Sequence, residues 1–164
     1  MISSNHTTEL DKILVKRLWA NEECPYFDLI MHENGKVFPL LIVSKDDSGI
    51  CVMKSDSWTP ISEVPNIEDE NKLNEGFAAI FSKDFPEMDL RVSCGECFSS
   101  GENGFISLSH LSSGDLIWLA FFVESNPFNS ICINKELVVA QSTDGRIFSL
   151  DLKNPTSVEI VSLS

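Results

Sequence analysis

The longest apolar run of the chain covers the eight residues 116–123, between turn-forming residues on both sides. It is too short to cross a bilayer as a helix, which takes about 20 residues. Its β-branched and aromatic side chains, with Gly114 before it and Pro127 after it, favour a strand buried on both faces over a helix segment, although periodicity alone does not separate the two. We predict that this run is the central strand of a sheet.

Four shorter apolar runs follow, at 130–133, 137–140, 146–150 and 158–161. Short polar segments separate them, and one of these contains Asp144-Gly145. Asp-Gly supplies the positive backbone φ that tight hairpin turns need, so neighbouring runs are expected to pair antiparallel. The C-terminal third is therefore predicted to be an antiparallel meander.

The N-terminal part begins with apolar residues at helical spacing over residues 7–20, and Thr8 with Asp11 fits a capping box. Asn34-Gly35 then lies between apolar runs at 26–31 and 36–43, which is the strongest short hairpin signal. A third strand is predicted at 50–53. Pro39 cannot donate a ladder hydrogen bond, which pushes its strand toward an edge or a bulge.

The middle of the chain is predicted to hold a loop at 56–65 and a second helix at about 68–83. Leu73, Phe77, Ile80 and Phe81 fall at positions i, i+4, i+7 and i+8, on one helix face, and acidic residues crowd the first turn. Gly76 weighs against this helix, since an interior glycine costs about 1 kcal/mol relative to alanine. Short strands are expected at 90–94 and 104–108.

These elements predict an α+β fold in a single domain over residues 1–164. It consists mainly of antiparallel sheet in meanders, with the N-terminal helix and the middle helix packed against one side. The start of the chain lacks the pattern of a secretory signal, and the five cysteines, an odd number, fit reduced thiols. A cytoplasmic location is expected.

The charge balance is strongly acidic, with 25 acidic and 12 basic residues and a formal net charge of −13. Binding to nucleic acid or to anionic lipid requires clustered lysine and arginine, so neither is expected. Acidic residues are densest in residues 66–90. A surface of this charge suits a basic protein partner.

Cys94-Gly95-Glu96-Cys97 is the most motif-like segment. A zinc site needs two further ligands, usually a second close pair, and the other cysteines and the histidines are isolated along the chain. A redox pair would precede a helix, and residues 98–101 do not start one. We interpret the segment as two thiols that flank a turn.

His110 lies near Ser107 and Ser109, but proximity in sequence is no evidence for a nucleophile–base pair. The segment 101–104 lacks the lysine and the following helix of a phosphate-binding loop. No catalytic residue, metal ligand or cofactor is assigned, and the protein is predicted not to be an enzyme.

The apolar residues 116–122, together with Ser125 to Phe128 and Ser142 to Gly145, resemble small bacterial cytosolic proteins of the polymorphic-toxin immunity type. These proteins are encoded beside secreted or contact-delivered toxins. The likeness covers the C-terminal third of the chain and rests on the strand pattern and the turns, so no residue role is transferred. It implies a non-enzymatic inhibitor that binds a cognate toxin domain, often a nuclease, and blocks or distorts its active site.

The sequence thus predicts a cytosolic binding protein that neutralises a basic partner, an immunity protein for a toxin domain. The alternative is an adaptor subunit that binds its partner through an exposed edge strand, with the strand of Pro39 as the candidate. A third hypothesis is an enzyme or ligand-binding domain with a pocket near His110 and the Cys94/Cys97 pair. The predicted contact surface consists of Asp46, Asp47, Glu68, Asp69, Glu70, Asp84, Glu87 and Asp89.

Overall fold

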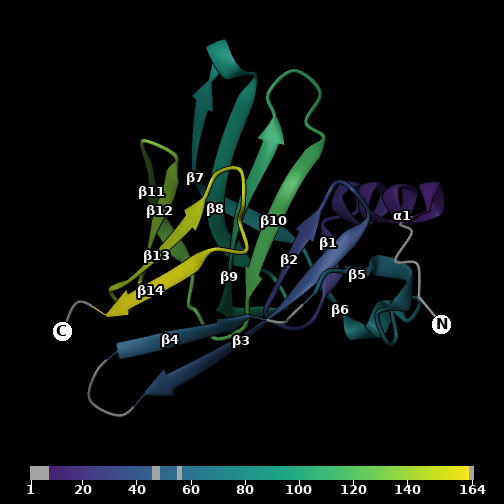
Figure 1. Cartoon of the computed structure of the whole chain (residues 1–164), viewed down its shortest axis with the longest axis horizontal. Coiled ribbons are helices and arrows are strands. Elements are labelled where there is room, and N and C mark those ends of the chain that lie inside the picture. Colours follow the sequence, from purple (N-terminus) through teal and green to yellow (C-terminus); the bar gives the residue numbers. More distant parts are fainter. Residues whose placement is uncertain (1–7, 46–48, 55–56, 163–164) are drawn as a thin grey trace.

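Two antiparallel sheets face each other across an apolar core, and a helix lies on the opposite face of the larger sheet (Figure 1). The computed structural model describes residues 8–45, 49–54 and 57–162. The larger sheet has the order β4-β3-β2-β10-β9-β8-β7, with β5 added to β3. The smaller sheet has the order β11-β12-β13-β14, and β1 pairs with β6 in a separate ribbon.

The elements alternate short strands with tight turns along the chain. Their bounds are α1 Glu9–Ala20, β1 Glu23–Pro25, β2 Leu29–His32, β3 Lys36–Lys45, β4 Gly49–Lys54, β5 Thr59–Pro60, η1 Ile61–Glu63, η2 Glu70–Lys72, β6 Leu73–Glu75, β7 Phe77–Phe85, η3 Pro86–Met88, β8 Leu90–Cys97, β9 Ser100–His110, β10 Leu116–Phe122, β11 Phe128–Asn134, β12 Leu137–Ser142, β13 Arg146–Asp151 and β14 Val158–Ser162.

Strand β10 lies in the middle of the larger sheet, between β2 and β9, which confirms the prediction of a central strand. Trp118, Ala120 and Phe122 point into the core shared with the smaller sheet. Leu119 and Phe121 point into the core beneath α1. Because each large apolar side chain that is fully buried contributes roughly 1.5–3 kcal/mol, this strand connects two substantial cores.

The smaller sheet is the antiparallel meander predicted for the C-terminal third, with a tight turn at Asp144-Gly145 between β12 and β13. Its inner face meets β10 through three aromatic rings. The centroid of Phe148 lies 4.9 Å from that of Phe122 and 4.8 Å from that of Phe128, in edge-on geometry. Such pairs stabilise a core beyond the area that they bury.

Helix α1 begins with the predicted capping box. The Thr8 amide and hydroxyl donate to the Asp11 carboxylate at 2.9 and 2.8 Å, and the Asp11 amide donates to the Thr8 hydroxyl at 3.2 Å. Asp11 also accepts a hydrogen bond from the Ser62 amide at 3.1 Å, which ties the helix to η1. Val15 and Leu18 are buried, whereas Leu10 is 74% exposed, so the buried stripe is narrower than the sequence pattern indicates.

The predicted middle helix at 68–83 is wrong, because this segment forms η2, β6 and most of β7. Gly76 has a φ of +76°, which a right-handed helix excludes. Ile80 and Phe81 are 48% and 40% exposed, so the helical spacing does not mark a buried face. β7 pairs with β8 from Phe77 to Phe85, with a bulge between Ala79 and Phe81. Pairing with a distant strand outweighs the local pattern here.

The strand of Pro39 is not an edge strand, since β3 lies between β2 and β4. On the side of β3 away from β2, β5 pairs with residues 36–37 and β4 pairs with residues 40–45. Residues 38–39 therefore have a partner strand on one side only, which is β2. The missing amide of Pro39 therefore falls where the ladder changes partners. Among the described residues, no helix is both long and apolar enough to cross a membrane.

Candidate partner-binding surface

The acidic residues predicted to form one contact surface lie in separate places. Asp46 and Asp47 fall outside the described residues. Residues 68–70 lie in the segment between η1 and β6, below α1, whereas residues 84–89 surround η3 at the far end of the β7–β8 hairpin (Figure 1). The structure thus does not bring the described members of the predicted set together.

The first group has one carboxylate with a structural role. The Asp69 side chain caps η2 by accepting from the Asn71 amide at 3.1 Å. Glu68 lies 3.9 Å from the Arg17 guanidinium in an exposed ion pair, which contributes little to stability. Glu70 is exposed and has no ion-pair partner among the described residues.

Two carboxylates of the second group are engaged by hydrogen bonds from the chain itself. Asp84 accepts two hydrogen bonds from Arg91, at 2.7 and 3.0 Å, and these bonds lower the pKa of the carboxyl. Asp89 accepts from the Ser112 amide and hydroxyl, both at 2.8 Å, which joins the β7–β8 turn to the β9–β10 turn and lowers its pKa. Glu87 is exposed and has no ion pair within the described part of the chain. This group therefore offers one free carboxylate.

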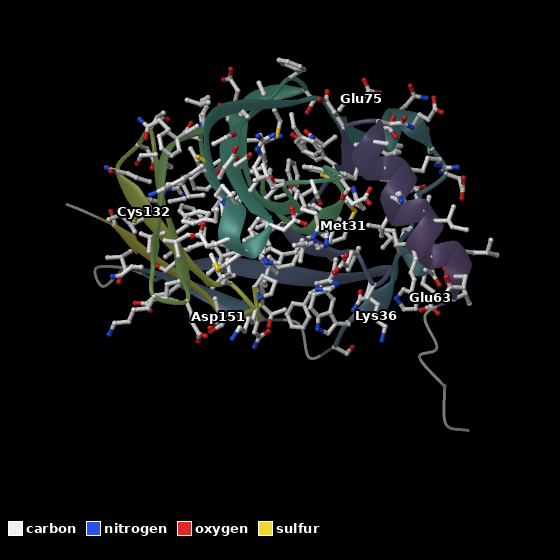
Figure 2. All side chains as sticks on the ribbon, turned by 90° about the horizontal axis from the view of Figure 1, so that it is seen from above. Met31, Lys36, Glu63, Glu75, Cys132 and Asp151 are labelled. Carbon is white, nitrogen blue, oxygen red and sulfur yellow. The ribbon has the colours of Figure 1, made fainter. Side chains whose placement is uncertain are left out.

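A third acidic cluster, which was not predicted, lies at the C-terminal end of α1. We call Glu22, Glu23 and Glu75 the helix-end cluster. Glu22 and Glu23 follow the helix directly, and Glu23 is the cross-strand partner of Glu75 in the β1–β6 ribbon. The Gly76 amide donates to the Glu22 carbonyl at 2.8 Å, which holds the two segments together. Figure 2 shows Glu75 at the surface beside the end of α1, far from Glu63 near its other end.

Each position in the helix-end cluster opposes local stability. The C-terminus of a helix carries partial negative charge and favours cations, yet two glutamates follow α1. Like charges directly opposite each other in a ribbon are destabilising. Glu22 has a φ of +58°, a left-handed conformation that glycine usually adopts after a helix. No described lysine or arginine forms an ion pair with any of the three carboxylates.

Aromatic side chains border the helix-end cluster. The rings of Trp19 and Phe77 lie 6.0 Å apart between centroids. Phe98 is 72% exposed, and its amide donates to the Gly76 carbonyl at 3.1 Å. A side chain at Gly76 would collide with the Phe98 ring, because a Cβ there would lie 2.1 Å from a ring carbon. Carboxylates beside one exposed ring and two half-buried rings form a surface suited to lysine and arginine side chains.

The prediction of a turn at Cys94–Cys97 is wrong, because this segment is part of strand β8. Cys94 lies in the core facing the smaller sheet and Cys97 in the core beneath α1, so the two thiols are on opposite faces of the sheet. Burial raises the pKa of each to about 12. Two such thiols do not share a metal ion, and at neutral pH they stay protonated and weakly nucleophilic.

His110 is placed between two carboxylates. Its Nε2 lies 3.8 Å from Glu33, and its Nδ1 lies 3.6 Å from Asp89. Ser107 and Ser109 form no side-chain hydrogen bond with it in the described part of the structure, so the geometry of a nucleophile–base pair is not present there. No group of three potential metal ligands occurs among the described residues.

The helix-end cluster was missed because it depends on a long-range pairing. Glu75 falls within the helix predicted at about 68–83, and nothing local shows that it lies opposite Glu23. One signal was available: Glu22-Glu23 directly follows a predicted helix end, where acidic residues are disfavoured. No protein-family model matches the sequence, and a search of curated proteins gives no significant match.

Proposed function

We propose that this protein is a cytoplasmic binding protein that captures and neutralises a basic protein, as an immunity protein does with its cognate toxin domain. The observation that carries the proposal is the helix-end cluster, in which Glu22, Glu23 and Glu75 gather without an ion-pair partner among the described residues. A basic partner would supply the missing positive charge.

The energetics support a binding role for this cluster. Opposed like charges in a ribbon cost about 0.2–1 kcal/mol, and a non-glycine residue in the left-handed region costs about 1–2 kcal/mol. Features that reduce the stability of the free protein are typical of functional surfaces. The net charge of −13 adds long-range attraction, which speeds the encounter with a cationic partner.

The three buried cysteines do not offer a reactive thiolate at neutral pH. The buried thiols of Cys24, Cys94 and Cys97 have raised pKa values, so they are protonated at neutral pH. The proposed inhibitor acts by occupying a surface of its partner. An acidic protein of this kind suits a toxin whose active site binds a polyanion, such as a nuclease, because that site is basic.

The second candidate is an adaptor that adds a partner strand to an edge of its sheet. Because the strand of Pro39 lies inside the larger sheet, we assign this candidate instead to β7, which is at one edge of that sheet. Ile80 is 48% and Phe81 is 40% exposed on this strand, which leaves apolar surface next to the unpaired ladder. A homo-oligomer in size-exclusion chromatography with light scattering, lost on Phe81→Lys, would favour this function.

The test of the leading proposal is calorimetry between this protein and the C-terminal domain encoded by the neighbouring upstream gene, at low and high salt. We expect tight binding that weakens with salt, and protection of cells that produce the domain. A folded, stable protein that does not bind the domain would contradict the immunity function.

A further inference from the structure

A groove of about 500 Å³ lies beside the helix-end cluster, between α1 and the uncovered parts of β7, β8 and β9. Trp19 and Phe77 line its end nearest the cluster, together with Glu22. Ser93 from β8 and Ser107 and Ser109 from β9 also line it, and we call it the serine groove. Its volume is within the range of ligand sites. The groove exists because α1 packs on β1, β3 and η1 and leaves this part of the sheet open.

Two serine hydroxyls of strand β9 open into the serine groove. Ser107 is 1% and Ser109 is 6% exposed, and neither side chain has a hydrogen-bond partner among the described residues. Ser93 pairs with the Ser82 hydroxyl at 2.8 Å. Ser107 and Ser109 are two residues apart on one face of strand β9, so their unpaired hydroxyls lie side by side in the groove and are free to bond a ligand there.

The charges that line the groove leave one carboxylate unbalanced. Arg91 is held by Asp84 at 2.7 Å, and Lys16 lies 3.5 Å from Asp115. Glu22 has no ion-pair partner in the described part of the chain, and it lies at the end formed by Trp19 and Phe77. The groove thus has a polar, neutral length and a negative, aromatic end.

We propose that the serine groove binds an extended, arginine-bearing segment of the basic partner, an inference that rests on the proposed function. The guanidinium stacks on Trp19 and Phe77 and donates hydrogen bonds to the Glu22 carboxylate, a combination that suits its planar, delocalised charge. The main chain of the segment lies over Ser107 and Ser109 and exchanges hydrogen bonds with their hydroxyls.

The test uses the full-length protein and the upstream-encoded domain, with affinities from calorimetry. Ser93→Trp fills the groove, and Glu22→Gln removes the charge without changing its shape. Ser130→Trp on β11 and Glu159→Gln on β14 are the matched controls, since both positions are exposed on the smaller sheet. Circular dichroism and thermal unfolding establish that each variant is folded.

We expect Glu22→Gln to weaken binding about tenfold or more, as for a hydrogen bond to a charged group, and Ser93→Trp to weaken it further. The controls should stay within about twofold of the parent, as exposed substitutions do. Phenylglyoxal labelling read by mass spectrometry should find an arginine of the domain protected in the complex and released by Glu22→Gln.

The outcomes separate the two proposals. If the parent binds the domain and both groove variants bind equally well, the groove assignment is overturned while the proposed function stands. Protection of lysines without any arginine overturns the assignment of the side chain. If the parent does not bind the domain at all, the proposed function fails and the groove assignment fails with it.

Discussion

Glu75→Lys should make the free protein more stable, because Glu75 lies opposite Glu23 in the β1–β6 ribbon. The substitution replaces a repulsive pair by an attractive one. Cross-strand charge pairs contribute about 0.2–1 kcal/mol, so we expect a gain of about 1 kcal/mol in the free energy of unfolding. For a domain of this size, that gain raises the midpoint of thermal unfolding by about 2–4 °C.

The assay is urea unfolding at low ionic strength, with Glu159→Lys as the control. Glu159 is an exposed glutamate on β14 that lies opposite Ser149 rather than another acid, so its reversal changes the net charge equally without removing a facing carboxylate. The difference between the two variants isolates the local pair. It should shrink at about 1 M salt, where the screening length is about 3 Å. Equal stability of the two variants would refute the repulsion on which the site rests.

Three further substitutions test the account. Glu22→Gly should stabilise the free protein by about 1 kcal/mol in urea unfolding, because glycine adopts the left-handed backbone conformation of residue 22 without strain. It should also weaken partner binding. A loss of stability would contradict the claim that the backbone at Glu22 is strained. Burial raises the pKa of Asp28 to about 6, and the negative charge of Glu124 adds to the rise. The hydrogen bond from the Val123 amide lowers this pKa but does not outweigh burial. The stability that Asp28 contributes is therefore complete below pH 4 and lost as the pH rises through about 6. Asp28→Asn should remove that loss and gain about 1–2 kcal/mol at pH 7, allowing for partial solvent exposure; an unchanged pH profile of unfolding would contradict it. Burial opposes ionisation of Asp11, but hydrogen bonds from Ser62 and Thr8 outweigh it and lower its pKa to about 2. Asp11→Ala should cost about 1–2 kcal/mol at pH 7 by calorimetric unfolding, and the deficit should fade as the pH drops from 4 toward 2; a deficit independent of pH would assign the effect to packing.

Local patterns were enough to predict most of the fold. The apolar run at 116–123 is buried on both faces of the sheet. Its continuous apolar composition predicts this burial without information on the strands that pair with it. Asn34-Gly35 and Asp144-Gly145 set tight turns by their own backbone preferences, and Thr8 with Asp11 forms a cap within four residues. In each case, the physical cause lies within a few residues of the effect.

The errors concern features set by distant contacts. Residues 77–85 form a strand because β8 pairs with them, and the bulge at Ile80 interrupts the strict alternation of apolar and polar residues that would mark a strand in the sequence. The helix-end cluster is invisible for the same reason, since Glu23 and Glu75 are far apart in sequence. Charge density along the chain correctly marks residues 68–70 and 84–89 as acidic. It does not show that Asp84 and Asp89 are already bound by Arg91 and Ser112.

The most direct test of the central claim compares two triple charge reversals in stopped-flow association with the upstream-encoded domain, over a series of ionic strengths. One variant reverses Glu22, Glu23 and Glu75, and the other reverses Glu68, Asp69 and Glu70. We predict that the first slows association, weakens its dependence on salt and raises the dissociation rate, whereas the second affects only the association rate. Association and dissociation rates of the first variant equal to those of the parent would contradict the account.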